Sequence, residues 1–538
     1  MTADWLLTGG RVETFSPDAG GGTALAIADG RVLAVGTDAD LEQLAGPATR
    51  RTDLGGATVW PGFIDTHIHL EKVSHEFQML RLEQARSVGE VVGIVRERAR
   101  AASEHVWIRC FADTAAWNER NLAEGRLPTR DELDAAAPRT PVYLYRRPDR
   151  AVINTVGAQR MADRLAGLPV ESYDPATGYL HGQAVRVVND AIYTQSMDDD
   201  EYRLAILDEA CGRLLRMGVT TVVDPGLAGA FEPSWALYRE ARRRDRLPLR
   251  VRLMNRFDWR KPFQEELDRL LAATALPMTG DENLRAWAVK LLLDGEFATA
   301  WMRSGEEIGD AHPHYTGEEL RTLLRLAADR GWPVCIHAMG GGAIGEIISA
   351  VDDVRRAGAP LESGQVSIAH AFLVDVLDLR ECARLGIKIS VNPPLGFVYS
   401  DEIRAAWGPL AGRTMPLATM SALGFRFAAG SDTHPCAPMH GALMAVTRRV
   451  WDGSSLGDHE SLTPREAFPM YTRHAGNYVG EPDLGHLAPG ARADLAVWPE
   501  DPLELDPEEW PRQEPLAVVI GGRPVHLDPS TPGSAFHV

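Results

Sequence analysis

The sequence contains little lysine, little cysteine and no long hydrophobic run. Only four of its 56 basic residues are lysine: Lys72, Lys261, Lys290 and Lys388. No stretch reaches the roughly 18 apolar residues of a membrane-spanning helix, and the N-terminal residues lack the basic and apolar regions of a secretion signal. The five cysteines are scattered without a Cys-x-x-Cys pair, which is typical of reduced, buried thiols. We therefore expect a cytoplasmic protein with no membrane partner.

The charge balance excludes a further class of partner. The net charge is −19, which disfavours binding to nucleic acid or to an anionic membrane surface. The hydrophobic share of 45% and the charged share of 24% are those of an ordinary globular enzyme. A small-molecule substrate is therefore the partner we expect. The oligomeric state stays open, with a homodimer as the assembly we consider.

The length and the hydrophobic pattern predict several structural parts. A chain of 538 residues exceeds the size of one hydrophobic core. Residues 5–60 contain short β segments, including two apolar runs joined by the hairpin signal Asp29-Gly30. Residues 493–526 show the same pattern of short β segments. We predict that residues 1–58 and 483–538 form one composite β-sandwich around a central domain at 59–482.

The central domain alternates apolar strands with helices, which indicates parallel α/β architecture. Eight candidate strands are present, and eight βα units favour a closed (β/α)₈ TIM-like barrel. The strands are Trp60–Asp65, Val219–Asp224, Leu249–Met254, Trp287–Leu293, Pro333–Ile336, Val366–Ala369, Ile387–Val391 and Phe425–Ala429. Helices are expected at Glu201–Met217, Gly317–Arg330 and Val374–Leu385. About 150 residues separate the first two strands, so we predict an inserted subdomain at about 74–200.

Histidine and aspartate side chains follow four of these strands. The first strand ends in His67-Ile-His69, and alternate residues of a strand point the same way. His337, His370 and Asp432 follow the fifth, sixth and eighth strands. Each alone could be a core histidine or a helix-capping aspartate. Because the carboxyl ends of barrel strands form one active face, the four strand ends together predict a metal site.

Lys290 follows the fourth strand and would face the same site. An ammonium repels a dication by about 4 kcal/mol per unit pair at 4 Å near a protein surface, and a buried unpaired lysine is costly. Either its head reaches solvent or the residue is chemically altered. Addition of CO₂ would give an anionic carbamate able to bridge two metals, so we predict N6-carboxylysine at Lys290.

These residues together resemble the binuclear amidohydrolase pattern. More narrowly, the chain is similar to the amidohydrolase 3 branch that contains YtcJ-like proteins and N-substituted formamide deformylases. Supporting stretches are Leu127-Pro-Thr-Arg-Asp-Glu-Leu-Asp134, Gly218-Val-Thr-Thr-Val-Val-Asp224, Val289-Lys-Leu-Leu-Leu-Asp-Gly295 and Gly485-His-Leu-Ala-Pro-Gly-Ala-Arg-Ala-Asp494. The resemblance covers nearly the whole chain. It implies a hydrolase acting on carbon–nitrogen bonds other than peptide bonds, with two divalent ions, zinc being favoured, held by His67, His69, Lys290, His337, His370 and Asp432.

Three departures from the family pattern leave the substrate open. In the inserted region relatives commonly have Asp-Gly-His before an asparagine, whereas here Pro148-Asp-Arg150 precedes Asn154. Relatives commonly have His-Ala-x-Gly-Asp after the fifth strand, whereas this chain has Gly341 at the acidic position. Glu71-Lys72 directly after His69-Leu70 is instead reminiscent of cytosine-deaminase-like sequences.

The expected reaction is attack on an amide or formamide-like bond by a metal-activated hydroxide. Two ions would lower the pKa of a shared water to about 7. Asp432 would accept its proton and pass it to the leaving nitrogen. His370 or His434 would assist the oxyanion, although His434 could equally be a loop residue.

Three further residues are candidates for the substrate pocket. His312 and His314 follow the fourth strand and are pocket or solvated loop residues. Lys72 could bind an anionic or polar part of the substrate, or pair with Glu71 or Glu76 on the surface.

Three alternatives remain. A mononuclear deaminase would use the same His-x-His and Asp but does not need the lysine, and it usually has a glutamate where this chain has Gly340. A metal-dependent decarboxylase or isomerase could use the same scaffold. A non-catalytic scaffold protein would be expected to have lost ligands, and this chain has lost none.

Overall fold

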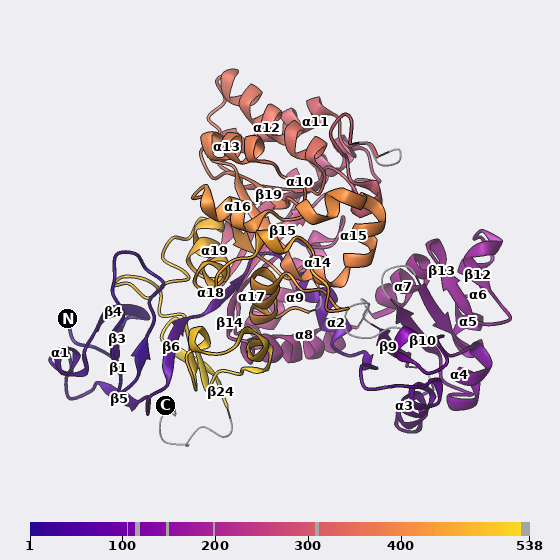
Figure 1. The fold of residues 1–538 in the computed structure, drawn as a ribbon, viewed down its shortest axis with the longest axis horizontal. Helices are drawn as coiled ribbons and strands as arrows, with labels where there is room; N and C mark the ends of the chain where they lie inside the picture. Colours follow the sequence, from indigo (N-terminus) through magenta and orange to yellow (C-terminus); the bar gives the residue numbers. More distant parts are fainter. Residues whose placement is uncertain are drawn as a thin grey trace. The chain divides into compact units, whose positions relative to one another are not determined.

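The structure is a computed structural model that describes residues 1–104, 106–112, 119–146, 150–196, 199–306, 311–433 and 435–528. The chain divides into two compact units. Unit 1 contains residues 1–70 and 208–538, and unit 2 contains residues 71–207. Figure 1 shows the elements of both units along the chain.

Unit 1 is built around an eight-stranded parallel sheet with the order β7-β14-β15-β17-β18-β19-β20-β21. The strands are β7 (Phe63–Asp65), β14 (Val219–Asp224), β15 (Arg250–Arg256), β17 (Leu284–Leu292), β18 (Val334–Ala338), β19 (Val366–His370), β20 (Lys388–Val391) and β21 (Ala428–Ala429), with the short β16 (Thr279–Gly280) added to β17. A parallel bridge between Ile68 and Asp432 joins the two outer strands just past their ends. This nearly closed sheet, with helices between its strands, confirms the predicted TIM-like barrel.

The barrel helices begin and end at recognisable capping residues. Helix α11 (Gly317–Arg330) has the predicted bounds because Thr316 and Glu319 form a capping box and Gly331 ends it at φ 67°. The other helices of unit 1 that the structure describes in this region are α9 (Phe231–Arg243), α10 (Phe263–Leu271), α12 (Gly341–Arg356), α13 (Val376–Leu385), α14 (Pro393–Val398), α15 (Ser400–Trp407), α16 (Leu417–Ala422), α17 (Pro438–Thr447), α18 (Pro464–Ala467) and α19 (Arg473–Tyr478). Helix α8 (Asp200–Leu215) contains residues of both units.

Several strand bounds differ from the sequence-based expectation, and the differences at the first and third strands bear on the site. The first predicted strand is split, because β6 (Thr58–Pro61) belongs to another sheet and only β7 joins the barrel. Gly62 lies between them, where a Cβ atom would lie 2.2 Å from the Thr220 side chain. The third strand runs on past the predicted Met254 to Arg256. That extension brings one more charged side chain to the carboxyl end of the barrel.

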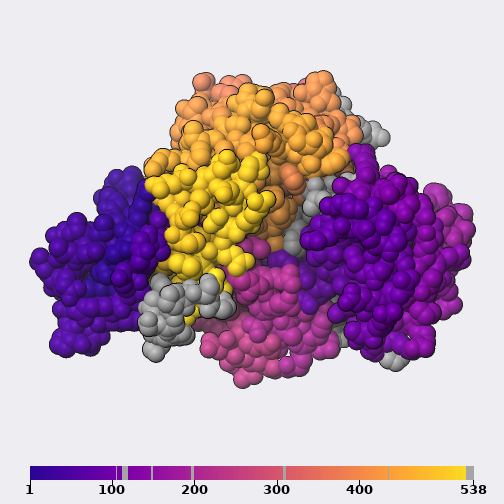
Figure 2. Space-filling view, turned by 60° about the horizontal axis from the view of Figure 1, so that its bottom comes forward, coloured from indigo at the N-terminus to yellow at the C-terminus, as the bar shows by residue number. Residues whose placement is uncertain are grey.

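Both ends of the chain form the remaining sheets of unit 1. One sheet has the order β4-β3-β1-β5, and the other has the order β2-β6-β22-β23-β24. The elements are β1 (Trp5–Thr8), β2 (Arg11–Val12), β3 (Ala24–Ala28), β4 (Arg31–Gly36), α1 (Asp38–Glu42), β5 (Arg50–Asp53), β22 (Leu495–Trp498), β23 (Ala517–Ile520) and β24 (Arg523–Leu527). Residues of both sheets share one apolar core. Figure 2 shows the indigo N-terminal and yellow C-terminal residues side by side, as the antiparallel pairing of β6 with β22 requires.

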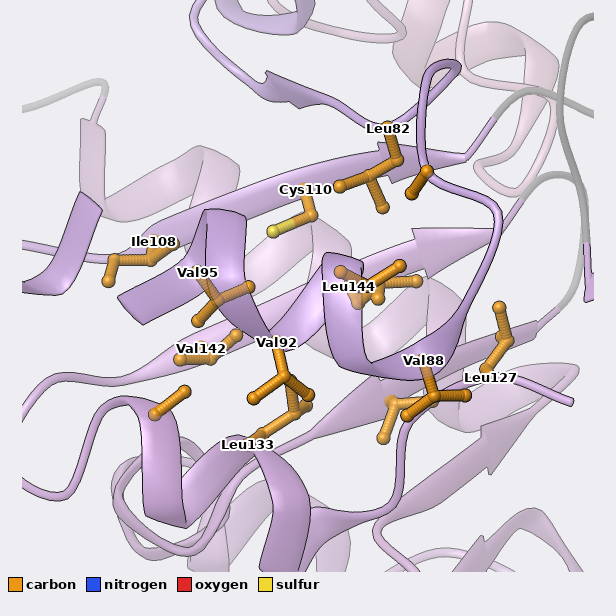
Figure 3. Packing of buried hydrophobic residues seen from close by; sticks show 14 of the residues in the cluster. Leu82, Val88, Val92, Val95, Ile108, Cys110, Leu127, Leu133, Val142 and Leu144 are labelled. Carbon is orange, nitrogen blue, oxygen red and sulfur yellow. The ribbon is translucent and has the colours of Figure 1, made fainter. Parts of the chain in front are cut away.

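Unit 2 contains a six-stranded sheet with the order β12-β13-β11-β10-β9-β8. Its elements are α2 (Leu70–Glu76), β8 (Leu80–Arg81), α3 (Val88–Ala101), β9 (Ile108–Ala112), α4 (Arg130–Ala136), β10 (Val142–Arg146), β11 (Arg150–Ile153), α5 (Thr155–Arg160), α6 (Ala162–Leu165), β12 (Tyr173–Asp174), β13 (Tyr179–His181) and α7 (Gln183–Ser196). The valines of α3 pack with strand residues such as Ile108 and Val142 (Figure 3). Unit 2 therefore has a hydrophobic core of its own.

None of the helices in the described ranges is long and apolar enough to cross a membrane.

Candidate metal centre

The structure brings five of the six predicted metal ligands together at the carboxyl ends of barrel strands. His67 and His69 follow β7, His337 lies in β18, His370 is the last residue of β19, and Asp432 follows β21. Because all these strands are parallel, their ends meet at one face of the barrel. The role of these five residues as metal ligands stays a prediction.

The carboxylate of Asp432 lies between three imidazoles. Its Oδ2 is 3.8 Å from His67 Nε2 and 3.9 Å from His370 Nδ1, and its Oδ1 is 3.7 Å from His69 Nε2. His67, His370 and Asp432 each offer a ligand atom, and these three atoms lie within 4.8 Å of one another. His337 adjoins this group, with its ring centroid 4.5 Å from that of His370.

The donor atoms fit a divalent cation. Nδ1 of His67 and Nδ1 of His370 are buried and accept or donate no hydrogen bond within the described residues. Buried polar atoms are normally paired, so these two unpaired nitrogens, on rings that each lie beside the Asp432 carboxylate, are consistent with metal ligation. Imidazole nitrogen and carboxylate oxygen are ligands that zinc accepts.

Burial keeps these imidazoles neutral. It lowers the pKa of His67 and of His370 well below the usual value, and it lowers the pKa of His337 to about 3; the positive charge of Lys290 adds to each shift. Only a neutral imidazole has a lone pair to give to a metal. These histidines are therefore in the ligating form at neutral pH.

Asp65 fixes the two strand ends that carry the first and last ligands. Its Oδ1 accepts hydrogen bonds from the backbone N–H groups of His67 at 3.1 Å and Ser431 at 3.0 Å, and its Oδ2 accepts one from Ser431 Oγ at 2.6 Å. A Cβ atom at Gly430 would lie 2.4 Å from the backbone nitrogen of His67. Asp65 and Gly430 thus allow β7 and β21 to approach closely where the site forms.

The backbone is strained at two of the candidate ligands. His370 has φ 79° and Asp432 has φ 67°, and neither residue is glycine. Such conformations cost about 1–3 kcal/mol each and persist where the surroundings impose them, which is common at active sites. The positive φ values change the direction of the backbone at the ends of β19 and β21, and with it the direction of the His370 and Asp432 side chains.

Lys290 lies in β17 beside the cluster, and its amine contacts Cys335. Its side chain is buried, and its Nζ donates a hydrogen bond of 3.6 Å to Cys335 Sγ. Burial lowers the pKa of Lys290, and the nearby Arg256 lowers it further. The structure therefore places the lysine at the predicted position, in a setting where its charged form is disfavoured.

Asp294 is a supporting residue that sequence reasoning did not single out. It is fully buried and accepts hydrogen bonds from the backbone of Trp301, Met339 and Gly340, all on segments beside the site. Its Oδ1 lies 3.6 Å from His337 Nε2, and burial raises its pKa to about 7. The sequence signal was present as the aspartate of Leu-Leu-Leu-Asp294-Gly after the fourth strand.

Arg256 is a second residue that sequence reasoning missed. It is the last residue of β15 and pairs with Lys290 across the sheet. Its charge lowers the pKa of Lys290 and of His337, and the charge of Asp432 acts on the pKa of Arg256. An arginine just past an apolar strand was the available signal, but the polar pair Asn255-Arg256 looks like a loop when the strand is taken to end at Met254.

The three predicted substrate-binding residues lie in different parts of the chain. The His314 ring stacks on Trp259 with centroids 4.1 Å apart, and its Nδ1 lies 3.2 Å from the Leu292 carbonyl oxygen. Lys72 lies in α2 and belongs to unit 2, and it forms no ion pair with any described residue; Glu71 pairs instead with Arg203. His434 lies outside the described residues.

Comparisons with known proteins agree along almost the whole chain. The sequence model of the amidohydrolase family matches residues 51–526. N-substituted formamide deformylase of Arthrobacter pascens is 26% identical over 96% of this chain and 97% of its own length. Putative amidohydrolase YtcJ of Bacillus subtilis is 26% identical over 98% of this chain and 99% of its own. These matches confirm the resemblance inferred from the sequence motifs.

A solved structure extends the similarity to the fold. An uncharacterized metal-dependent hydrolase from Pyrococcus furiosus superimposes with a TM-score of 0.74 at 26% identity, covering 93% of this chain and 100% of the other.

Proposed function

We propose a reaction for this chain from the premise that it belongs to the amidohydrolase family and is a metal-dependent hydrolase of carbon–nitrogen bonds. In this proposal the enzyme cleaves an amide or formamide-like bond of a small molecule, with Asp432 as general base and acid. The observation that carries the proposal is the position of the Asp432 carboxylate, 3.7–3.9 Å from three imidazoles at the carboxyl end of the barrel.

The proposed metal ligands are His67, His69, His337, His370 and Asp432, joined by Lys290 in carboxylated form. The set would hold two divalent ions, and zinc is favoured by its nitrogen and oxygen donors. When bound, such ions lower the pKa of water and polarise the carbonyl oxygen of a substrate.

Asp432 moves the proton in this proposal. Its carboxylate takes a proton from the attacking water and later delivers it to the leaving nitrogen, which departs as a neutral amine. His67 and His69 lie 3.8 and 3.7 Å from the carboxylate oxygens. His370, which is buried and neutral, contributes to stabilising the developing negative charge on the carbonyl oxygen.

The carbamate on Lys290 resolves a conflict of charges. The side chain is buried beside Arg256, which is a second cation. Reaction of the uncharged amine with CO₂ forms an N–C bond and releases one proton, giving an anion with two oxygens. In that form Lys290 would no longer repel a metal at the site, and the carbamate would supply oxygen ligands.

The remaining predicted residues are proposed for substrate binding. His314 forms with Trp259 a flat stacked pair, and 42% of the Trp259 surface is exposed. Lys72 and His434 stay proposals that rest on the sequence alone.

A mononuclear deaminase is the second candidate, and one observation favours it. The tightest group of ligand atoms comes from only three residues, His67, His370 and Asp432, while the Lys290 amine bonds to Cys335. A single ion could be held without the lysine.

The proposal is tested with purified full-length protein and a substrate panel. N-benzylformamide and other N-substituted formamides, N-acyl amines, cytosine and adenine are assayed before and after removal of metal by a chelator. We expect amine release from a formamide or amide, its loss on chelation and its return with Zn²⁺. Ammonia release from the bases alone would establish the deaminase instead, and turnover that survives complete metal removal would contradict both.

A further inference from the structure

Arg256 is a half-buried cation at the mouth of the barrel, and no described residue forms an ion pair with it. It ends β15, the third barrel strand (Figure 1), with Lys290 as its register partner on β17. Its Nε is buried and has no hydrogen-bond partner among the described residues. Its side chain keeps an intermediate exposure, so the end of the guanidinium can still reach a ligand.

The acids near Arg256 do not neutralise it. The charges that act on it most belong to Asp432, Glu296 and Asp258, and none of these comes within ion-pair distance in the described part of the chain. Asp258 is bound by Arg260, with contacts of 2.7 and 2.8 Å. Asp432 already faces three imidazoles, and Glu296 is exposed. Buried cations are normally paired, so this guanidinium lacks the anion that its setting requires.

A second donor near Arg256 is also unpaired. The hydroxyl of Tyr315 is buried and has no hydrogen-bond partner among the described residues, and its ring packs on Phe263. The positive charge of Arg256 acts on this hydroxyl. Tyr315 directly follows His314, whose ring stacks on Trp259 from the loop after β15. The loops after the third and fourth strands thus present two unused donors and one flat aromatic surface.

We infer that Arg256, with Tyr315, binds a carboxylate of the substrate, so that the enzyme acts on amides or formamides that also carry a carboxylate. The inference rests on the proposed function for the bond that is cleaved, but the anion site itself does not depend on that function. A guanidinium presents two parallel N–H donors that match the two oxygens of a carboxylate, and the Tyr315 hydroxyl can donate a third hydrogen bond.

A different role for Arg256 would give a different result. If the guanidinium only held the carbamate of Lys290, its loss would lower metal content and turnover on every substrate alike. A substrate-binding role predicts unchanged metal content and an effect confined to anionic compounds, expressed mainly in KM.

The first test measures binding to the metal-loaded, full-length protein with a matched pair of ligands that cannot be hydrolysed, 3-phenylpropanoate and 3-phenylpropan-1-ol. Titration calorimetry on Arg256→Met should show carboxylate binding weakened about 10-fold or more, and alcohol binding changed less than about 2-fold. Tyr315→Phe should weaken carboxylate binding by a smaller factor. Lys261→Met is the control, because it removes an equal charge from the same loop at an exposed position, where Lys261 pairs with Glu265.

The second test measures turnover of N-formylphenylalanine and N-formylphenylalaninamide. Wild-type protein should prefer the carboxylate, and Arg256→Met should abolish that preference through KM. Equal carboxylate binding by wild type and Arg256→Met, no carboxylate binding by either, or loss of metal in the variant would overturn the inference. If neither compound is hydrolysed but carboxylate binding still depends on Arg256, the anion site stands and the proposed reaction fails.

Discussion

Asp432 is the residue on which the proposed chemistry depends most. Its carboxylate faces His67, His69 and His370, and its backbone is held at φ 67° by its bridge to Ile68 and by the hydrogen bond from its N–H to the His67 carbonyl oxygen. Its position is therefore imposed by the barrel closure, and an isosteric replacement should keep it.

Asp432→Asn should keep the fold and most of the bound metal and lose turnover by about 100-fold or more, because an amide cannot accept the proton of the attacking water. Steady-state kinetics and elemental analysis on the same preparation measure both effects. Asp452→Asn, at an exposed loop position, is the matched control. Wild-type turnover in Asp432→Asn would exclude the proposed general base.

Lys290→Ala should lose at least one equivalent of metal and most activity, and acetate or propionate should restore part of both by supplying the missing carboxylate oxygens. A carbamate signal in ¹³C NMR after growth or incubation with ¹³C-bicarbonate should be present in the wild type and absent from this variant. Lys261→Ala removes an exposed lysine paired with Glu265 and serves as the control. An unmodified Lys290 beside two fully occupied metals would contradict the carbamate.

The residues of the centre could be predicted to different degrees. Five of them could be predicted from the sequence, because each lies at the end of a recognisable apolar strand and strand ends meet in a barrel. They are His67, His69, His337, His370 and Asp432. That no described residue pairs with Arg256 could not be predicted, because it depends on which acids of other segments are already paired. The direction of the Lys290 amine toward Cys335 likewise depends on side-chain packing that the sequence does not encode locally.

Among the structural elements, the end of β19 shows how a strand is turned at the site. His370 and Ala371 both have positive φ, 79° and 46°, and Ala371 is fully buried with its N–H bonded to the Ala338 carbonyl oxygen at 3.0 Å. Left-handed backbone costs an L-residue about 1–2 kcal/mol. The neighbouring strand therefore holds a conformation that the local sequence disfavours.

Ala371→Gly and Ala371→Val should separate backbone strain from packing. Glycine relieves the left-handed conformation but gains entropy in the unfolded chain, so stability should stay within about 1 kcal/mol of wild type. Valine adds a β-branched side chain to a buried left-handed position and should lower stability by about 2 kcal/mol or more. Thermal unfolding midpoints compare the two. Equal losses in both variants would indicate that the alanine methyl, not the backbone, matters at this turn.

Element boundaries were predictable where the signals are local. The bounds of Gly317–Arg330 follow from the capping box at Thr316 and the glycine at position 331. The split of Trp60–Asp65 into β6 and β7 was not predictable, because the apolar pattern continues through it while the two halves pair with different sheets. Only the long-range contact of Gly62 with Thr220 distinguishes them.

At the scale of the whole molecule, a buried ion pair joins the barrel to the sheet made from both chain ends. Arg250 begins β15, and Asp494 immediately precedes β22. The guanidinium donates to Asp494 through Nε at 2.6 Å and through a second nitrogen at 3.0 Å, and both side chains are 2% exposed. Asp494 also accepts a hydrogen bond from the Gly521 backbone at 2.7 Å, between β23 and β24.

Asp494→Leu should lower the free energy of unfolding by about 3–5 kcal/mol, because it leaves the Arg250 guanidinium buried without its anion. Arg250→Met should have a comparable effect, because it leaves the Asp494 carboxylate buried without its cation. The double variant removes both charges, so it should be more stable than the sum of the single losses predicts, by several kcal/mol in a double-mutant cycle from urea unfolding. It should not fully match wild type, since the Gly521 N–H loses its acceptor. Strict additivity of the two losses would mean that the Arg250–Asp494 pair contributes no coupling energy between the barrel and the terminal sheets.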